Sequence, residues 1–187
     1  AAAFRAVLAE DDAAIGVRTP VERREVETLY GTAEAPLLWL DDAGRPSATA
    51  REAMALLDGA ASEGLDPDDY AGAALARAAS ALDGEGGPDI DSLARFDVGL
   101  SLHLLRYWRH LHTGRVDPRA VGFRMNAPVD DHDFAAMLRE ALAAERLGGA
   151  TEDLRPPLAL YRALVRALAT YRRLAAEAVP LELVVPK

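Results

Sequence analysis

The longest helical pattern in the chain reads Asp91-Ser-Leu-Ala-Arg-Phe-Asp-Val-Gly-Leu-Ser-Leu-His-Leu-Leu-Arg-Tyr-Trp-Arg-His-Leu-His-Thr-Gly114. Apolar side chains recur in it at three- and four-residue steps, which is the spacing of a helix face, and they are Leu93, Phe96, Leu100, Leu104, Tyr107 and Leu111. A second apolar stripe consists of Val98, Leu102 and Leu105. A helix that is apolar on most of its circumference is buried. The segment therefore predicts a central helix over 91–113 that other helices surround, with Gly114 ending it at a positive φ.

Composition favours an all-α fold and excludes several kinds of function. The chain has 187 residues, of which 50% are hydrophobic and only 6% aromatic, so its core is mostly Ala and Leu, both strong helix formers. A net charge of −9 argues against a nucleic-acid-binding surface. Cysteine is absent, which excludes thiolate metal sites and thiol nucleophiles within this chain. No run is long and apolar enough for a membrane span.

The amino-terminal part predicts two helices. The first is short and covers about 1–10. The second has the clearest start in the sequence, because Thr19 can cap it, Pro20 suits the first helical position and Glu22 completes a capping box. We expect this helix to run to Tyr30, before Gly31.

The next part predicts an extended segment and two more helices. The segment 36–40 is too short and too close to proline for a helix, so we expect it to be extended and to place Trp39 in the core. Ser47 can then cap a helix that Gly64 ends at a positive φ. An alanine-rich helix follows over about 73–82.

The carboxy-terminal part predicts two helices and a tail. Asp131 is expected to cap a helix from His132 to Leu147, which the pair Gly148-Gly149 breaks. The last long helix begins near Pro157, with apolar residues at helical spacing: Leu158, Tyr161, Val165, Leu168, Tyr171 and Leu174. The prediction as a whole is an all-α, irregular multi-helix bundle over 1–178. Residues 179–187 are expected to form a tail or linker that is extended at 180–186.

No group of residues predicts a catalytic, cofactor or metal site. His103 and His110 share a helix face but are two turns, about 10 Å, apart, which is too far for one ion. His112 points away from His110. The acidic runs at 130–133 and 66–69 fit helix capping better than cation binding. The serines lack the context of an activated nucleophile. Any pair of carboxylates could be drawn as an acid and a base, so a carboxylate-based hydrolase would need a cleft that sequence cannot show.

Four motifs, taken in order, resemble the helical scaffold domain of the large periplasmic murein L,D-transpeptidases. They are Tyr30 with Pro36-Leu-Leu-Trp39, then Gly64-Leu-Asp-Pro-Asp-Asp-Tyr70, then Tyr107 with Leu111-His-Thr-Gly-Arg-Val-Asp-Pro118, and finally Tyr161 with Leu168-Ala-Thr-Tyr-Arg172. The positions that carry the resemblance are Tyr30, Pro36, Trp39, Gly64, Leu65, Asp66, Pro67, Tyr70, Tyr107, Gly114, Arg115, Val116, Pro118, Tyr161 and Tyr171.

The resemblance implies a non-catalytic part in peptidoglycan 3→3 crosslinking. In that family the scaffold accompanies a peptidoglycan-binding module and a catalytic module with a Cys nucleophile, which this chain lacks. The implied partners are those modules, on the same or another polypeptide, and peptidoglycan itself, and the implied location is the periplasm. The chain departs from the family pattern at 32–35 and 178–181. A stand-alone periplasmic binding or adaptor protein with the same fold is therefore the alternative.

Overall fold

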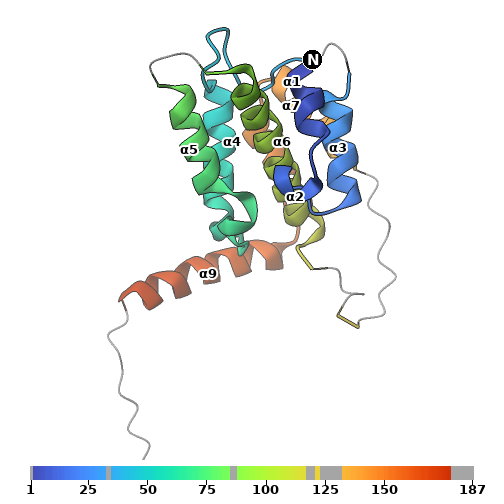
Figure 1. Cartoon of the computed structure of the whole chain (residues 1–187). Helices are drawn as coiled ribbons and strands as arrows, with labels where there is room; N and C mark the ends of the chain where they lie inside the picture. Colours follow the sequence, from blue (N-terminus) through green and yellow to red (C-terminus); the bar gives the residue numbers. More distant parts are fainter. Residues whose placement is uncertain (1, 33–34, 85–87, 117–120, 123–131, 178–187) are drawn as a thin grey trace, which may run out of the picture.

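Helix α6 (Ile90–Thr113) runs through the centre of the molecule (Figure 1). The computed structural model describes residues 2–32, 35–84, 88–116, 121–122 and 132–177. Within these ranges all regular elements are helical, and the one β-bridge joins Leu40 to Pro46, which confirms the all-α prediction. The other elements are α1 (Ala2–Leu8), α2 (Asp12–Ile15), α3 (Pro20–Tyr30), α4 (Ala48–Asp58), α5 (Gly72–Leu82), α7 (Phe134–Ala143), α8 (Leu147–Asp153), α9 (Ala159–Glu177) and the 3₁₀ turns η1 (Gly59–Glu63) and η2 (Pro67–Tyr70).

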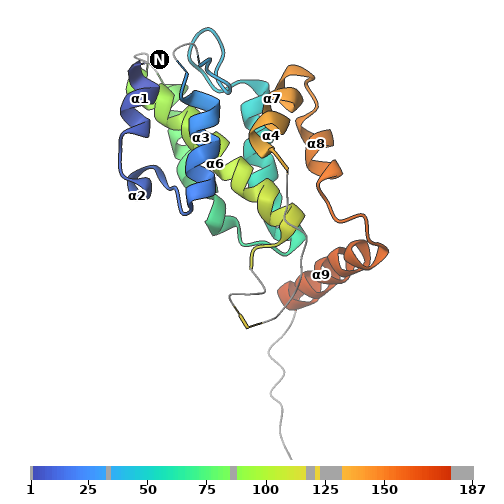
Figure 2. The ribbon, with the colours of Figure 1, turned by 90° about the vertical axis from the view of Figure 1, so that its right-hand side faces the viewer.

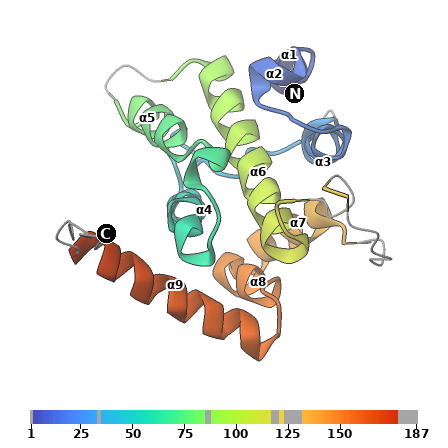
Figure 3. The ribbon, with the colours of Figure 1, turned by 90° about the horizontal axis from the view of Figure 1, so that it is seen from below.

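The central helix is buried on nearly all sides, as its two apolar stripes predict. Helices α1, α3, α4, α5 and α7 pack against it (Figure 3). Of the residues in the two apolar stripes, only Leu93 is partly exposed. Burying one leucine side chain fully stabilises the fold by about 1.5–3 kcal/mol. Asp89 caps the helix by accepting hydrogen bonds from the backbone N–H groups of Asp91 and Ser92. Gly114 ends it at a φ of 91°, as expected.

The amino-terminal helix signals are confirmed. Thr19 and Glu22 form the reciprocal capping box of α3, which ends at Tyr30. The short helix α2, between α1 and α3, has no counterpart in the sequence prediction. It spans a single turn and buries no side chain, so it leaves no apolar periodicity in the sequence.

The helix that Ser47 caps is shorter than predicted. It ends at Asp58, and residues 59–63 continue as the 3₁₀ turn η1 before Gly64 closes the segment at a φ of 81°. The N–H of Gly64 donates to the carbonyl of Ala61 over 3.0 Å, and that of Leu65 donates to Ala60 over 3.2 Å. The chain therefore turns at Gly64 as predicted, but the 3₁₀ geometry of the last turn makes the α-helix end earlier in the sequence, at Asp58.

The carboxy-terminal prediction was wrong in detail. Asp133, and not Asp131, caps α7, which begins at Phe134 and ends at Ala143. The glycine pair does not break a helix, because both glycines lie inside α8. The N–H of Gly148 donates to Glu52 Oε1 of α4 over 2.9 Å, and a Cβ on Gly148 would lie 2.9 Å from the same oxygen. The missing side chain thus lets α8 approach α4 closely (Figure 2).

The extended segment at 36–40 places Trp39 in the core with no exposed surface, as predicted. The expected tail at 179–187, with its extended part at 180–186, lies outside the described residues, as do Pro118 and Asp131. Helix α9 crosses one end of the bundle and extends beyond α5 (Figure 1). We call that end of the bundle, made of η1, η2 and the last turn of α6, the foot.

Candidate functional site

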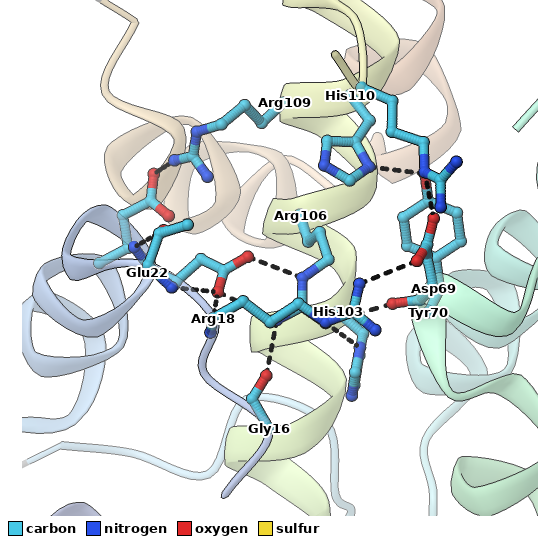
Figure 4. Close-up of polar contacts among 12 residues, drawn as sticks. Gly16, Arg18, Glu22, Asp69, Tyr70, His103, Arg106, Arg109 and His110 are labelled. Carbon is cyan, nitrogen blue, oxygen red and sulfur yellow. Dashed lines mark hydrogen bonds and ion pairs between the residues drawn. The ribbon is translucent and has the colours of Figure 1, made fainter. Parts of the chain in front are cut away.

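A buried arginine on the central helix joins three other parts of the chain. Arg106 is 1% exposed, and all five of its N–H groups have acceptors (Figure 4). Nε and Nη2 donate to the two carboxylate oxygens of Glu22 over 2.7 and 3.0 Å, and Nη2 also donates to the carbonyl of Gly16 over 2.6 Å. Nη1 donates to the carbonyl of Asp69 and to His103 Nδ1, each over 3.2 Å. One side chain therefore fixes α3 and η2 relative to α6.

Glu22 is placed for this ion pair by its position in α3. Glu22 is the third residue of α3 and the partner of Thr19 in the capping box, and its carboxylate also accepts the backbone N–H groups of Arg18, over 2.6 Å, and Thr19, over 3.2 Å. Burial alone would raise the pKa of Glu22, but the hydrogen bonds from Arg106 and Arg18 hold that pKa below its usual value. Glu22 is therefore ionised at neutral pH and balances the buried guanidinium.

Asp69, beside this pair, links two loops that carry the family motifs. Its Oδ1 accepts Arg18 Nη1 over 2.8 Å, and its Oδ2 lies 2.6 Å from Arg115 Nε, in the segment after α6. Burial acts to raise the pKa of Asp69, yet the two arginines lower it. The loops 64–70 and 114–116 are thus joined through one carboxylate.

Two histidines of α6 complete the polar cluster and are neutral at neutral pH. An arginine can only donate, so His103 Nδ1 is the acceptor in its contact with Arg106. Burial, followed by the charge of Arg106, lowers the pKa of His103 to about 4. Burial likewise lowers the pKa of His110, whose Nδ1 lies 2.9 Å from the hydroxyl of Tyr70. Burial raises the pKa of Tyr70, so its hydroxyl remains protonated.

A cavity of about 360 Å³ opens at the foot, beside these loops. Glu63 and Tyr161 both line it, and Glu63 accepts hydrogen bonds from the Tyr161 hydroxyl over 2.6 Å and from Arg155 Nε over 2.8 Å. These contacts hold the first turn of α9 against the foot. The remaining lining residues are Leu65, His110, Leu111, His112, Thr113, Gly114, Arg115 and Pro156.

Most of the motif positions fall into two groups. Around the foot lie Gly64, Leu65, Asp66, Pro67, Tyr70, Tyr107, Gly114, Arg115 and Tyr161. Asp66 caps η2, Pro67 is its first residue, and the rings of Tyr70 and Tyr107 meet edge to face at 5.5 Å. Tyr30 and Trp39 are buried elsewhere, against α6, near the exposed Pro36. Val116 and Tyr171 are 57% and 72% exposed, so they hold no part of the core.

Tyr30 and Trp39 meet at a polar cluster that sequence reasoning missed. Asp97 of α6 has no exposed surface, and its carboxylate accepts the backbone N–H groups of Leu38, over 3.0 Å, and Trp39, over 2.9 Å. The Tyr30 hydroxyl lies 2.8 Å from Asp97 Oδ1 and 2.6 Å from Ser101 Oγ, and Trp39 Nε1 donates to that Oγ over 2.8 Å. Buried polar groups need hydrogen-bond partners. A polar residue within an apolar helical stretch therefore indicates a buried polar contact, and Asp97, Ser101 and Arg106 are three such residues in α6.

The described residues contain no cluster of three or more His, Cys, Asp or Glu side chains that could hold a metal ion. In the same part of the chain, no helix combines the length and apolar character that crossing a membrane requires. Asp133, from the acidic run at 130–133, accepts the N–H of Ala136 and so acts as a helix cap. The site is therefore a network of ion pairs and hydrogen bonds that positions loops around a cavity.

Comparison with known proteins agrees with this picture of a structural domain. Searches among curated proteins and among solved structures gave no match. A family model described as Scaffold domain matches residues 24–168, which is well over half of the chain. The match runs from α3 into α9 and includes Asp69, Asp97 and Arg106. The chain belongs to the Scaffold domain family.

Proposed function

We propose that the chain is the non-catalytic scaffold of a murein L,D-transpeptidase-like protein that acts in peptidoglycan 3→3 crosslinking in the periplasm. Its role is to position a catalytic module and a peptidoglycan-binding module. The family match supports a scaffold role, and the four motifs link that role to murein enzymes. The observation that carries the proposal is the joining of the loops 64–70 and 114–116 through Asp69, with Arg106 fixed behind it.

Such an arrangement suits a docking surface. A partner that binds preformed loops avoids the entropy cost of ordering them. Asp69 forms ion pairs with Arg18 and Arg115, and Arg106 donates to the Asp69 carbonyl, so the loop backbones are held before any partner arrives. The exposed side chain of Val116 lies at the edge of this surface and is free to contact a second module.

Chemistry by this chain itself is not part of the proposal. Acyl transfer through a covalent intermediate needs a nucleophile with an adjacent base, and the sequence has no cysteine. Three serines donate to backbone carbonyls or cap helices: Ser47, Ser62 and Ser80. Ser92 donates to Asp89, and Ser101 is buried in the Trp39 cluster. None of these contacts pairs a serine with a histidine.

Intact-mass analysis tests the absence of catalysis. The protein is incubated with meropenem and with purified muropeptides, alongside a Cys-containing L,D-transpeptidase as a positive control. We expect the control to gain the mass of an acyl adduct and this chain to gain none. An adduct on this chain, or any crosslinked muropeptide that it forms, would contradict the proposal.

The positive role is tested in the bacterium that encodes the protein. Deleting the gene should lower the share of 3→3 crosslinks in digested peptidoglycan, and the wild-type gene should restore it. Val116→Asp, at the proposed docking surface, should fail to restore it. Val21→Asp is the matched control, because Val21 is 41% exposed in the first turn of α3 and tolerates an acidic residue there. Unchanged crosslinking after deletion would instead favour a stand-alone adaptor.

A further inference from the structure

Helix α9 has a large apolar surface that no described part of the chain covers. Among the described helices longer than four residues, α9 alone buries no side chain. Only Tyr161, Val165 and Leu168 are partly covered, where the helix crosses the foot. Its other large apolar side chains remain exposed: Leu160 by 68%, Leu164 by 59%, Tyr171 by 72% and Leu174 by 50%.

These exposed side chains follow the spacing of a coiled-coil interface. With Ala167, they recur at alternating steps of four and three residues, which is the a/d pattern of a heptad repeat. We call the five residues Leu160, Leu164, Ala167, Tyr171 and Leu174 the α9 seam. Such a pattern is complementary to another helix of similar length.

A flat membrane fits the seam poorly. At about 100° per residue, the seam lies on the flank of α9, roughly a quarter turn from the side that Val165 and Leu168 press against the foot. The side that faces directly away from the bundle carries Ala163 and Thr170 instead. A groove of about 420 Å³ runs between the seam and the foot, lined in part by Gly64, Leu164 and Tyr171. A single helix is narrow enough to enter the groove between the seam and the foot, whereas the flat surface of a bilayer is not.

The charges around the seam favour an identical partner. Charged residues at the e and g positions beside a seam set the choice and the orientation of the partner helix. Here the e positions are Tyr161, Leu168 and Ala175, and the g positions are Ala163, Thr170 and Glu177. The four arginines of α9 lie on the remaining positions, away from the seam: Arg162, Arg166, Arg172 and Arg173. Two copies can therefore meet without bringing like charges together.

We propose that two copies of this chain associate through the α9 seam as a parallel, in-register helix pair. Each helical bundle lies on the e side of its own α9. In a parallel pair, the e side of one helix is next to the g side of the other. The two bundles therefore lie on opposite sides of the helix pair. An antiparallel pair would place both bundles on the same side, where they collide. The small g residues Ala163 and Thr170 of one copy then fit the groove beside the other. Figure 3 shows α9 along one edge of the molecule.

The size of the interface predicts a weak to moderate dimer. Five side chains per copy, each presenting on the order of 100 Å², bury about 1,000 Å² in total, the lower limit for a specific interface. Sedimentation equilibrium of the full 187-residue chain, from micromolar to millimolar concentration, should therefore show a reversible monomer–dimer equilibrium. Leu164→Glu should raise the dissociation constant at least about tenfold without changing the far-UV circular dichroism, because Leu164 is exposed in the monomer.

Single cysteines test the geometry, since the chain has none of its own. In a parallel pair, Ala167→Cys and Leu160→Cys should each form a disulfide-linked dimer on mild oxidation. Ala169→Cys, on the far side of the helix, is the matched control and should remain monomeric. Leu160→Cys mixed with Leu174→Cys should give no mixed dimer.

Three results would overturn the proposal. One is a monomer at every concentration. Another is a mixed dimer between Leu160→Cys and Leu174→Cys, which only an antiparallel pair can form. The third is binding to anionic vesicles that Leu164→Glu abolishes while the protein stays monomeric. None of these outcomes depends on the proposed role in peptidoglycan crosslinking.

Discussion

Replacing Arg106 by methionine should be among the most damaging single changes in this protein. Met fills a similar volume but donates no hydrogen bond, so the Glu22 carboxylate stays buried with only two backbone N–H donors. The carbonyls of Gly16 and Asp69 lose a donor as well. Removing one partner of a buried ion pair costs about 3–5 kcal/mol. The total free energy of unfolding of a protein domain is about 5–15 kcal/mol.

The pH dependence of this loss identifies its cause. In the wild type the pKa of Glu22 is below its ordinary 4.5, so its contribution to stability is present above that pH and is lost as the pH falls through the folded-state value. Without Arg106, we expect burial to outweigh the two remaining backbone hydrogen bonds and to raise the pKa of Glu22 above its ordinary value. The variant then gains stability as the pH falls, because protonation removes the unpaired charge. The difference between the two proteins should therefore shrink from neutral pH to about pH 5.

Urea unfolding followed by circular dichroism measures both effects. The double variant Arg106→Met with Glu22→Gln is the control, because it removes both charges and should recover part of the loss. If Arg106→Met lowers the free energy of unfolding by less than about 1 kcal/mol, or by an amount that does not change with pH, the Glu22–Arg106 ion pair does not hold α3 to α6.

Four further substitutions test other parts of the structure by the same unfolding measurements. Burial raises the pKa of Asp97 to about 6, so its ionisation should lower stability as the pH rises from about 4 to about 6; Asp97→Asn should remove that slope and cost about 1–3 kcal/mol. Gly64→Asn should be nearly neutral at φ 81° and ψ 10°, whereas Gly114→Asn should cost about 1–3 kcal/mol at φ 91° and ψ 156°, a glycine-only conformation. Equal losses at the two glycines would contradict this. Gly99→Ala should stabilise by about 1 kcal/mol, since a Cβ there would lie 3.7 Å from Leu75 Cδ2, an ordinary contact.

Helix caps and turn glycines in the sequence correctly predicted the helix ends at which they occur. The capping box at Thr19 and Glu22, and the turn at Gly64, are stabilised by residues within a few positions, so sequence is sufficient to find them. Gly148 shows the limit, because its place inside α8 depends on the approach of Glu52, which lies far away in the sequence. A glycine pair in isolation favours a helix break.

The candidate site was predictable only in part. The motifs marked the loops 64–70 and 114–116, and both lie at the cavity. The ion pair that joins them, between Asp69 and Arg115, was not predictable. Neither were the contacts of Arg106 with Gly16, Glu22 and Asp69, which lie 37 to 90 residues away in the sequence and meet Arg106 only after the helices pack. Sequence shows that a charged residue stands in an apolar helix. It does not show which carboxylate will reach it.

The position of α6 in the chain has a consequence for how the protein is made. Helices α1, α3, α4 and α5 all precede α6 in the sequence and all pack against it. During synthesis from the amino terminus, their apolar faces therefore emerge before the surface that covers them. A nascent chain that stops before Ile90 lacks the helix against which these apolar faces pack. Apolar surface that stays exposed in this way promotes aggregation or chaperone binding. The domain is committed to fold late, when the residues up to Thr113 have left the ribosome.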